Sequence, residues 1–124
     1  MRVFIYSSKA IVALILLQTL YFKFSGNTES VYIFQQLGME PYGRIGSGVV
    51  ELAASILLFF DKTKFYASIT VVGTMLGAII AHLFVLGIEV MNDGGTLFVL
   101  ALIALIFSLI LSFCLNPNLK KIYK

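Results

Sequence analysis

Charged residues, cysteine and histidine are all scarce in this sequence, and each shortage excludes a class of protein. Charged residues make up 12% of the 124 positions and hydrophobic residues 60%, whereas a soluble domain carries about 25% charged residues. A soluble core of this size could not hide that much apolar surface, so we expect a single domain embedded in a lipid bilayer. The net charge of +3 does not indicate nucleic-acid binding, because the basic residues flank apolar segments and form no cluster with stacking side chains.

The single cysteine and the single histidine limit the chemistry. Cys114 alone cannot form an intrachain disulfide or a CxxC pair, which excludes quinone reduction through a dithiol of this chain. His82 alone cannot provide bis-histidine haem ligation. With one histidine and one intramembrane glutamate we predict no metal site, and no motif decides whether the protein is an enzyme.

Long apolar segments predict an all-α fold. We expect an antiparallel bundle of four transmembrane helices at about 4–24, 43–60, 66–87 and 96–115, because about 20 apolar residues cross a ~30 Å hydrocarbon core. The loop at 25–42 is too rich in large apolar residues for a plain connection. We expect a short extra helix there, with Asn27 or Thr28 as its cap, Gly38 as its stop and Pro41 before the second span.

The distribution of basic residues predicts the orientation. Four spans place both termini on one side, together with the turn at 61–64. Two basic residues, Lys23 and Arg44, fall on the other side, against seven on the side of the termini: Arg2, Lys9, Lys62, Lys64, Lys120, Lys121 and Lys124. Because basic residues are enriched in cytoplasmic segments, we expect a multi-pass protein of the cell (inner) membrane with both termini cytoplasmic.

An acid inside the second span is the most informative residue. Glu51 has no basic residue nearer than Arg44, seven positions back. Its same-face neighbours on a helix are all small: Ser47, Gly48, Ala54 and Ser55. A carboxylate facing lipid is costly, whereas small neighbours allow another helix to come close and shield it. We therefore expect Glu51 to face the bundle interior.

The predicted helix directions place three polar side chains at one depth. Counting 1.5 Å per residue from the outer boundary, Glu51 and Gln18 lie ~9 Å deep and His82 ~7.5 Å deep. We therefore predict an intramembrane polar site of Glu51, His82 and Gln18, with direct or water-mediated contact between the first two. Lys23 and Arg44 form its rim, one or two turns above.

Two interpretations of this layer remain open. It could be a structural clasp, since intramembrane hydrogen bonds contribute ~0.6 kcal/mol each. Alternatively, it could be a proton-handling or ligand site, because ionisable residues inside a membrane are functional by default and histidine exchanges protons near neutral pH.

The third span contains a regular series of small residues. Gly73, Gly77 and Ala81 recur every four positions, a pattern that favours close helix packing. We expect this ridge to lie against another helix. If it occupies the interior face, His82 turns outward instead.

Two segments resemble the DoxX/DoxX-like family of small four-helix membrane proteins. The G-x-x-E pattern with its small and apolar continuation at 48–58, preceded by Leu37-Gly38 and Pro41, is similar to that family. The segment 77–83 (GAIIAHL) looks like its G-A-x-x-A-H-L motif. The resemblance covers essentially the whole chain and implies a membrane redox context, since the family is associated with quinol oxidation and thiosulfate:quinone oxidoreduction.

The preferred function is a small membrane subunit or accessory protein of a quinone-linked redox system. The alternatives are a carrier or binding protein for a small lipophilic or weakly acidic molecule, and a structural scaffold for a membrane partner. We expect no cofactor held by the chain itself, with a quinone or lipid as the candidate bound molecule. The expected partners are the bilayer, further copies of the chain, or a membrane or redox protein.

Overall fold

A computed structural model of the protein describes residues 2–90 and 94–116, and all regular structure in these residues is helical. The elements are α1 (Arg2–Ser25), α2 (Thr28–Gln36), α3 (Tyr42–Leu57), α4 (Lys64–Ala81), a π-helix, η1 (His82–Leu86), and α5 (Thr96–Leu115). The predicted turn at 92–95 lies partly outside the described residues. Pro117 and the basic tail residues Lys120, Lys121 and Lys124 lie entirely outside them.

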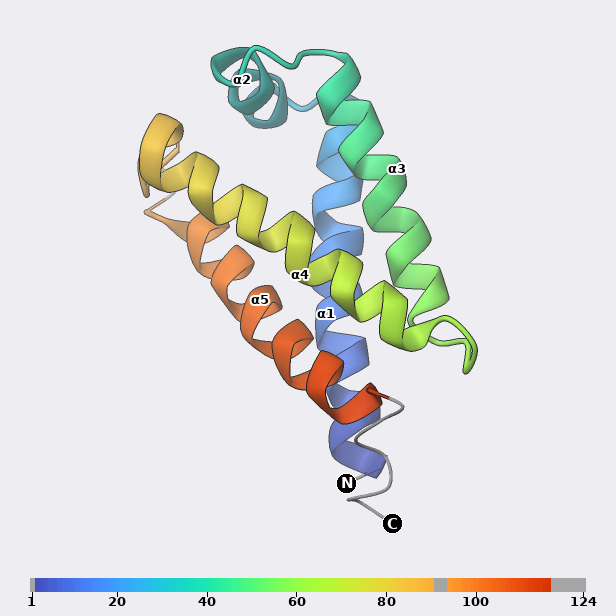
Figure 1. Ribbon diagram of the computed structural model, residues 1–124. Helices are drawn as coiled ribbons and strands as arrows, with labels where there is room; N and C mark the ends of the chain where they lie inside the picture. The colour runs from blue at the N-terminus through green and yellow to red at the C-terminus, as the bar shows by residue number, and fades with distance from the viewer. Residues whose placement is uncertain (1, 91–93, 117–124) are drawn as a thin grey trace.

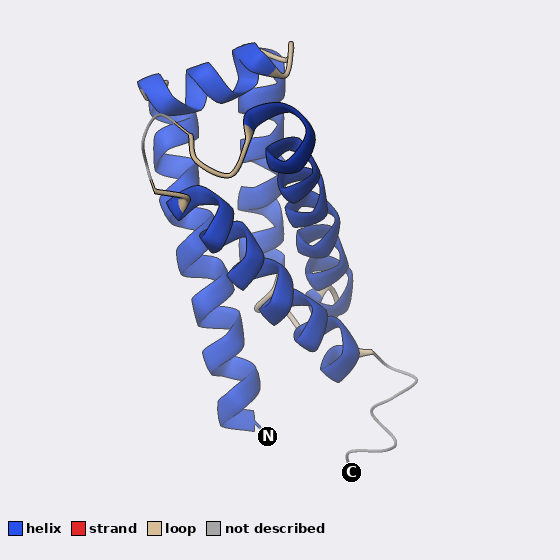
Figure 2. Ribbon diagram, turned by 90° about the vertical axis from the view of Figure 1, so that its left-hand side faces the viewer, coloured by secondary structure: helices blue, strands red, loops and turns tan. Residues whose placement is uncertain are grey.

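The four longer helices run alternately up and down the molecule (Figure 1). α1 packs against α3 and α5, and α4 packs against α5 and α3. The start of α1 and the end of α5 lie at the same end (Figure 1). α2 lies across the opposite end and contacts α1, α3 and η1 (Figure 2). α2 therefore caps the end of the bundle opposite the start of α1.

Local signals explain the short helix α2. The Asn27 side chain accepts a hydrogen bond from the Glu29 backbone N–H at 2.9 Å, which caps the first turn as predicted. Gly38 has φ +72°, a left-handed conformation that glycine adopts at low cost and that commonly ends a helix. The predicted extra helix in the first loop is confirmed.

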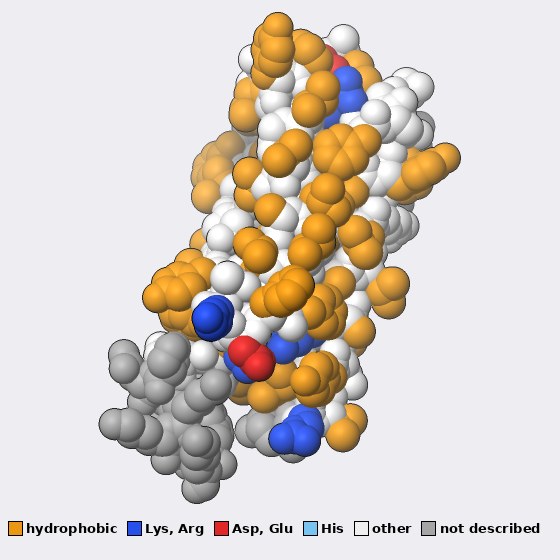
Figure 3. Space-filling view, turned by 90° about the vertical axis from the view of Figure 1, so that its right-hand side faces the viewer, with side chains coloured by type: hydrophobic (Ala, Val, Ile, Leu, Met, Phe, Trp, Pro, Cys, Tyr) orange, Lys and Arg blue, Asp and Glu red, His pale blue; other side chains and the backbone are white. Residues whose placement is uncertain are grey.

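Apolar side chains lie on the outside of the protein as well as in its core. Large hydrophobic residues are exposed along every helix, and Figure 3 shows a face mostly covered by them, with charged side chains towards its two ends. Three helical segments are long and apolar enough to cross a membrane: Arg2–Ser25, Lys64–Leu86 and Thr96–Leu115. This arrangement fits a membrane protein, since lipid can cover an apolar exterior.

The second predicted span is shorter than expected. α3 has 16 residues and ends at Leu57, so the predicted helix at 43–60 is wrong at its C-terminal end. The chain turns there because Phe59 and Phe60 donate backbone hydrogen bonds three residues back, at 3.2 and 3.3 Å, a tighter pattern than the α-helix. Four membrane-spanning segments therefore remain a prediction.

The packing of α4 corrects the predicted role of the glycine ridge. A Cβ atom added at Gly73 or Gly77 would meet no atom within 4 Å, so neither glycine packs against another helix in the part of the chain that the structure describes. The opposite face of α4 is buried instead, with Val71 and Met75 in the core. His82 follows these residues at helical spacing and is therefore turned inward.

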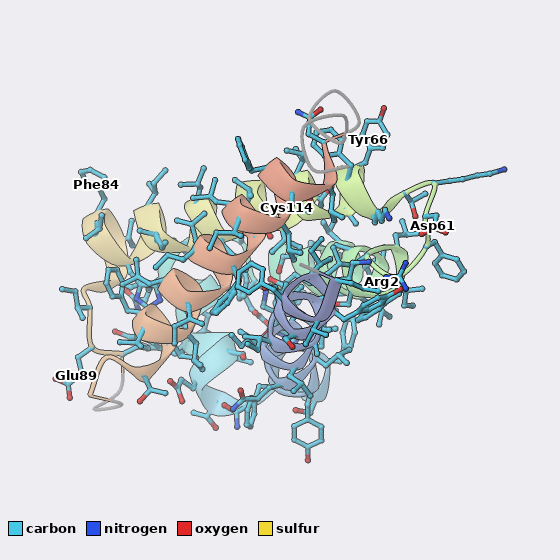
Figure 4. All side chains as sticks on the ribbon, turned by 90° about the horizontal axis from the view of Figure 1, so that it is seen from below. Arg2, Asp61, Tyr66, Phe84, Glu89 and Cys114 are labelled. Carbon is cyan, nitrogen blue, oxygen red and sulfur yellow. The ribbon has the colours of Figure 1, made fainter. Side chains whose placement is uncertain are left out.

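Exposed aromatic residues mark both ends of the α4–η1 segment. Tyr66 is 69% exposed and Phe84 is 80% exposed, and both point away from the other helices in Figure 4. The outward face of this segment therefore carries an exposed aromatic side chain near each end.

Candidate functional site

A cavity of about 550 Å³ lies at the end of the molecule that α2 covers. Leu16, Glu51 and His82 form its buried walls, and exposed side chains such as Met39, Ile80 and Val85 border it outside. Most of its lining is apolar. The polar exceptions are Thr19, Lys23, Ser30, Ser47, Glu51, Thr74 and His82. Such a mostly apolar space with a few polar groups is typical of small-molecule sites.

Glu51 and Lys23 form an ion pair on one wall of the cavity. Lys23 Nζ lies 2.6 Å from Glu51 Oε1, and the two side chains are 15% and 5% exposed. α3 presents the carboxylate from a face of small residues. At Gly48 an added Cβ would lie 2.8 Å from the Phe24 ring and 3.4 Å from Leu20 of α1. The predicted close approach of another helix is thus confirmed, and that helix is α1.

Two hydroxyl groups complete the surroundings of this ion pair. Lys23 Nζ also donates to Ser47 Oγ at 3.2 Å. Thr19 Oγ1 lies 3.3 Å from Glu51 Oε2 and 2.8 Å from the Leu16 carbonyl oxygen. Because a hydroxyl has one hydrogen, Thr19 donates to one of these acceptors at a time. The Thr19 hydroxyl is therefore a second donor beside the Glu51 carboxylate, and it can turn to the Leu16 carbonyl oxygen instead.

Arg44 holds the top of α3 against the end of α1. Its Nε lies 3.0 Å from both carboxylate oxygens of Glu40. Its Nη1 donates to the backbone carbonyl oxygen of Lys23, in the last turn of α1, where a cation is favoured by the helix dipole. Arg44 thus holds in place the last turn of α1, which carries the Lys23 side chain.

His82 is held by the π-helix rather than by Glu51. Its Nδ1 lies 2.9 Å from the Gly87 carbonyl oxygen, and its own carbonyl oxygen accepts from the Gly87 N–H at 2.7 Å. The ring meets Phe98 of α5 edge to face, with centroids 5.5 Å apart. The side chain is buried and lines the cavity.

The predicted polar layer is therefore corrected in two respects. Glu51 and His82 line one cavity, but no direct hydrogen bond joins them among the described residues, where the carboxylate contacts Lys23 and Thr19 and His82 Nδ1 contacts Gly87. The water-mediated form of the predicted contact stays a prediction. Gln18 does not join them, since it is exposed on α1. Its neighbour Thr19, rotated by about 100° on the helix, takes its place.

Sequence reasoning missed Thr19 and understated Lys23 and Ser47. A signal was present, because Thr19 and Lys23 are four residues apart and so share a helix face, which Gln18 does not. Lys23 was expected a turn or two above the acid. Its flexible four-carbon stem reaches down to Glu51 instead of extending to the membrane surface.

The two charged residues that line the cavity are paired with each other, and a second ion pair lies nearby. Lys23 is paired with Glu51, and Arg44 with Glu40. An anionic or cationic ligand would have to displace one of these partners, whereas an uncharged molecule would not. The cavity therefore favours a neutral, mostly apolar molecule with hydrogen-bonding groups.

Comparisons of the chain with protein-family models, with curated proteins and with solved structures found no match in any of the three. The resemblance to DoxX-like proteins accordingly stays a prediction.

Proposed function

We propose that this chain is an integral membrane protein that binds a small, uncharged lipophilic molecule. The observation that carries the proposal is the cavity of about 550 Å³, whose apolar lining is interrupted by the Lys23–Glu51 pair and by His82. Its exposed border includes the apolar side chains of Met39, Ile80 and Val85. In a bilayer, a ligand would therefore enter from the lipid rather than from water.

The proposal includes a membrane arrangement. α3 would be the fourth transmembrane helix of an antiparallel bundle, beside the three longer apolar segments. The excess of basic residues at the end that carries the N-terminus and the 61–64 turn supports a cytoplasmic location for that end. The cavity would then lie in the outer half of the membrane.

A quinone is the specific ligand within this proposal. The resemblance to DoxX-like proteins implies a quinone-linked redox system, in which the chain would act as an accessory subunit. A quinone combines an apolar ring with polar oxygen atoms, as the mixed lining of the cavity requires. Lys23 and Thr19 could donate hydrogen bonds to such oxygens.

Two exposed glycines of α4 provide a matched test. Gly77 belongs to the cavity lining and Gly73, a turn earlier, does not, and an added Cβ would meet no atom within 4 Å at either position. We expect Gly77→Leu to weaken the binding of 2-methoxynaphthalene at least about tenfold, or ~1.4 kcal/mol, and Gly73→Leu to leave it unchanged. Fluorescence titration in lipid nanodiscs, with empty nanodiscs subtracted, measures both.

Both variants should fold, because leucine is a better helix former than glycine. Circular dichroism and the melting temperature check this. Equal binding by the parent and Gly77→Leu would show that the probe occupies some other place, and an absence of binding to the parent would refute the proposed function.

A further inference from the structure

The π-helix gives His82 a defined arrangement of hydrogen-bonding atoms. A carbonyl oxygen only accepts hydrogen bonds, so the 2.9 Å contact between Nδ1 and the Gly87 oxygen requires the hydrogen to be on Nδ1. The neutral ring then carries a lone pair on Nε2, which can only accept. Among the described residues Nε2 has no hydrogen-bond partner.

The backbone holds this arrangement in place. The Gly87 N–H returns to the His82 carbonyl oxygen across five residues, the spacing of a π-helix, an element that often occurs at functional sites. Gly87 itself has φ +82° and ψ 170°, a conformation essentially restricted to glycine. Phe98 packs edge-on against the ring, so the side chain is constrained from two directions.

The polar group across the cavity has the complementary character. The Lys23 ammonium has three hydrogens, and Glu51 and Ser47 accept two of them. One hydrogen remains, near the face of the Phe34 ring, whose centroid is 5.6 Å from Nζ. The Lys23 side of the cavity can thus donate a hydrogen bond, whereas the His82 side can accept one.

We propose that His82 Nε2 is the group that selects the ligand, by accepting a hydrogen bond from a hydroxyl group. The ligand class is then a neutral lipophilic alcohol or phenol, such as the reduced quinol form of a quinone, rather than the oxidised quinone, an ether or a hydrocarbon. This inference rests on the proposed function and narrows it.

Substitution of His82 by asparagine or by glutamine separates its two roles, which are donation from Nδ1–H to Gly87 and acceptance of a ligand hydrogen bond by Nε2. The amide of asparagine can replace Nδ1–H as the donor to Gly87, but it places no acceptor where Nε2 lies. Glutamine extends further and can place its amide oxygen near the Nε2 position. If His82 has only a structural role, asparagine should preserve ligand binding. If His82 binds a hydroxyl group, glutamine should preserve ligand binding better than asparagine.

The probes are 2-naphthol and 2-methoxynaphthalene, which differ by the hydroxyl hydrogen. We expect His82→Asn to weaken 2-naphthol binding about tenfold and to leave 2-methoxynaphthalene binding unchanged. His82→Gln should keep 2-naphthol binding within about threefold of the parent. Measuring both probes in the same nanodiscs cancels their different partition into lipid, and the melting temperature of each variant checks its folding.

The possible results of these binding measurements distinguish a structural role of His82 from a hydroxyl-binding one. Equal losses for both probes in His82→Asn would show a structural role and overturn the inference, as would an unchanged ratio of affinities. If Gly77→Leu abolishes binding of both probes while the His82 variants keep the parental ratio, the cavity binds lipophiles without selecting hydroxyl groups. If the parent binds neither probe, this inference and the proposed function fall together.

Discussion

The Lys23–Glu51 pair is a buried interaction whose stability depends on both members. At 2.6 Å, with side chains 15% and 5% exposed, the two charges neutralise each other where water is largely excluded. Removing one partner from a buried pair leaves an uncompensated charge, whereas removing both can be nearly neutral. We therefore expect a single substitution in the pair to destabilise the protein more than the double substitution does.

A double-mutant cycle tests this coupling. We expect Glu51→Gln to lower the free energy of unfolding by about 3 kcal/mol, because Lys23 loses its counter-charge. Adding Lys23→Met to it should restore most of the loss, since no charge then remains at the site. Chemical unfolding in mixed micelles, followed by circular dichroism, measures the coupling.

Two results would contradict this expectation. A double variant that is less stable than either single variant would show that the two side chains act independently. A Glu51→Gln variant as stable as the parent would mean that water or lipid head groups solvate Lys23. Gln18→Leu, on the exposed face of α1, is a control that should change stability by less than about 0.5 kcal/mol.

Single residues show where sequence reasoning succeeds and where it fails. The inward orientation of Glu51 followed from its small neighbours, and Gly48 indeed lies against α1. Gln18 was chosen over Thr19 because depth was counted but rotation was not. An apolar helix has hydrophobic residues on all sides, so its sequence gives little information on which face points inward.

Among the elements, η1 is the least regular and the most informative. It ends at Gly87, where an added Cβ would meet nothing within 4 Å, so space does not require glycine there. The backbone conformation requires it, because φ +82° with ψ 170° disfavours any side chain. The conformation in turn presents the Gly87 carbonyl oxygen to His82.

Gly87→Ala should therefore disturb the π-helix without a steric clash. We expect a loss of about 1–3 kcal/mol in unfolding free energy, with faster amide hydrogen exchange in residues 82–87. Hydrogen exchange followed by mass spectrometry measures the local effect.

Gly46→Ala is the matched control for this change. Gly46 lies within helix α3, has no positive φ and also has open space around it. Alanine should stabilise that helix by up to ~1 kcal/mol. Equal effects of the two substitutions would contradict a special role for the Gly87 backbone.

The elements themselves were more predictable than their packing. The helix predicted at 96–115 has the same bounds in the structure, because its apolar run is uninterrupted and glycines precede it. The π-helix was not predicted, since nothing in a run of apolar residues distinguishes one helical hydrogen-bond pattern from another. The glycine ridge of α4 was expected to lie against another helix, but Gly73 and Gly77 face open space, because small residues favour close packing without specifying the partner.

For the whole molecule, the orientation in the membrane is the main expectation still to be measured. The start of α1 and the 58–63 turn lie at one end and α2 at the other (Figure 1). The positive-inside rule predicts that the first end is cytoplasmic. Thr28, on α2, and Asp61, in the turn, are both exposed and so provide one labelling position at each end.

Cysteine labelling of whole cells tests this orientation in a Cys114→Ser background. We expect a cysteine at Thr28 to react with an impermeant maleimide added outside, and a cysteine at Asp61 to react only after the membrane is permeabilised. The reverse pattern would place the cavity in the cytoplasmic half of the bilayer. Reaction at both positions without permeabilisation would exclude a membrane-spanning arrangement.

The length of α3 has a consequence for the surrounding bilayer. Its 16 residues extend roughly 24 Å at 1.5 Å per residue, whereas a typical hydrocarbon core is ~30 Å thick. The bilayer would have to become thinner beside α3 to match its length, but not beside the 24-residue α1. If α3 spans the membrane as proposed, this hydrophobic mismatch would make the protein's environment asymmetric around its circumference and would favour thin membranes over thick ones.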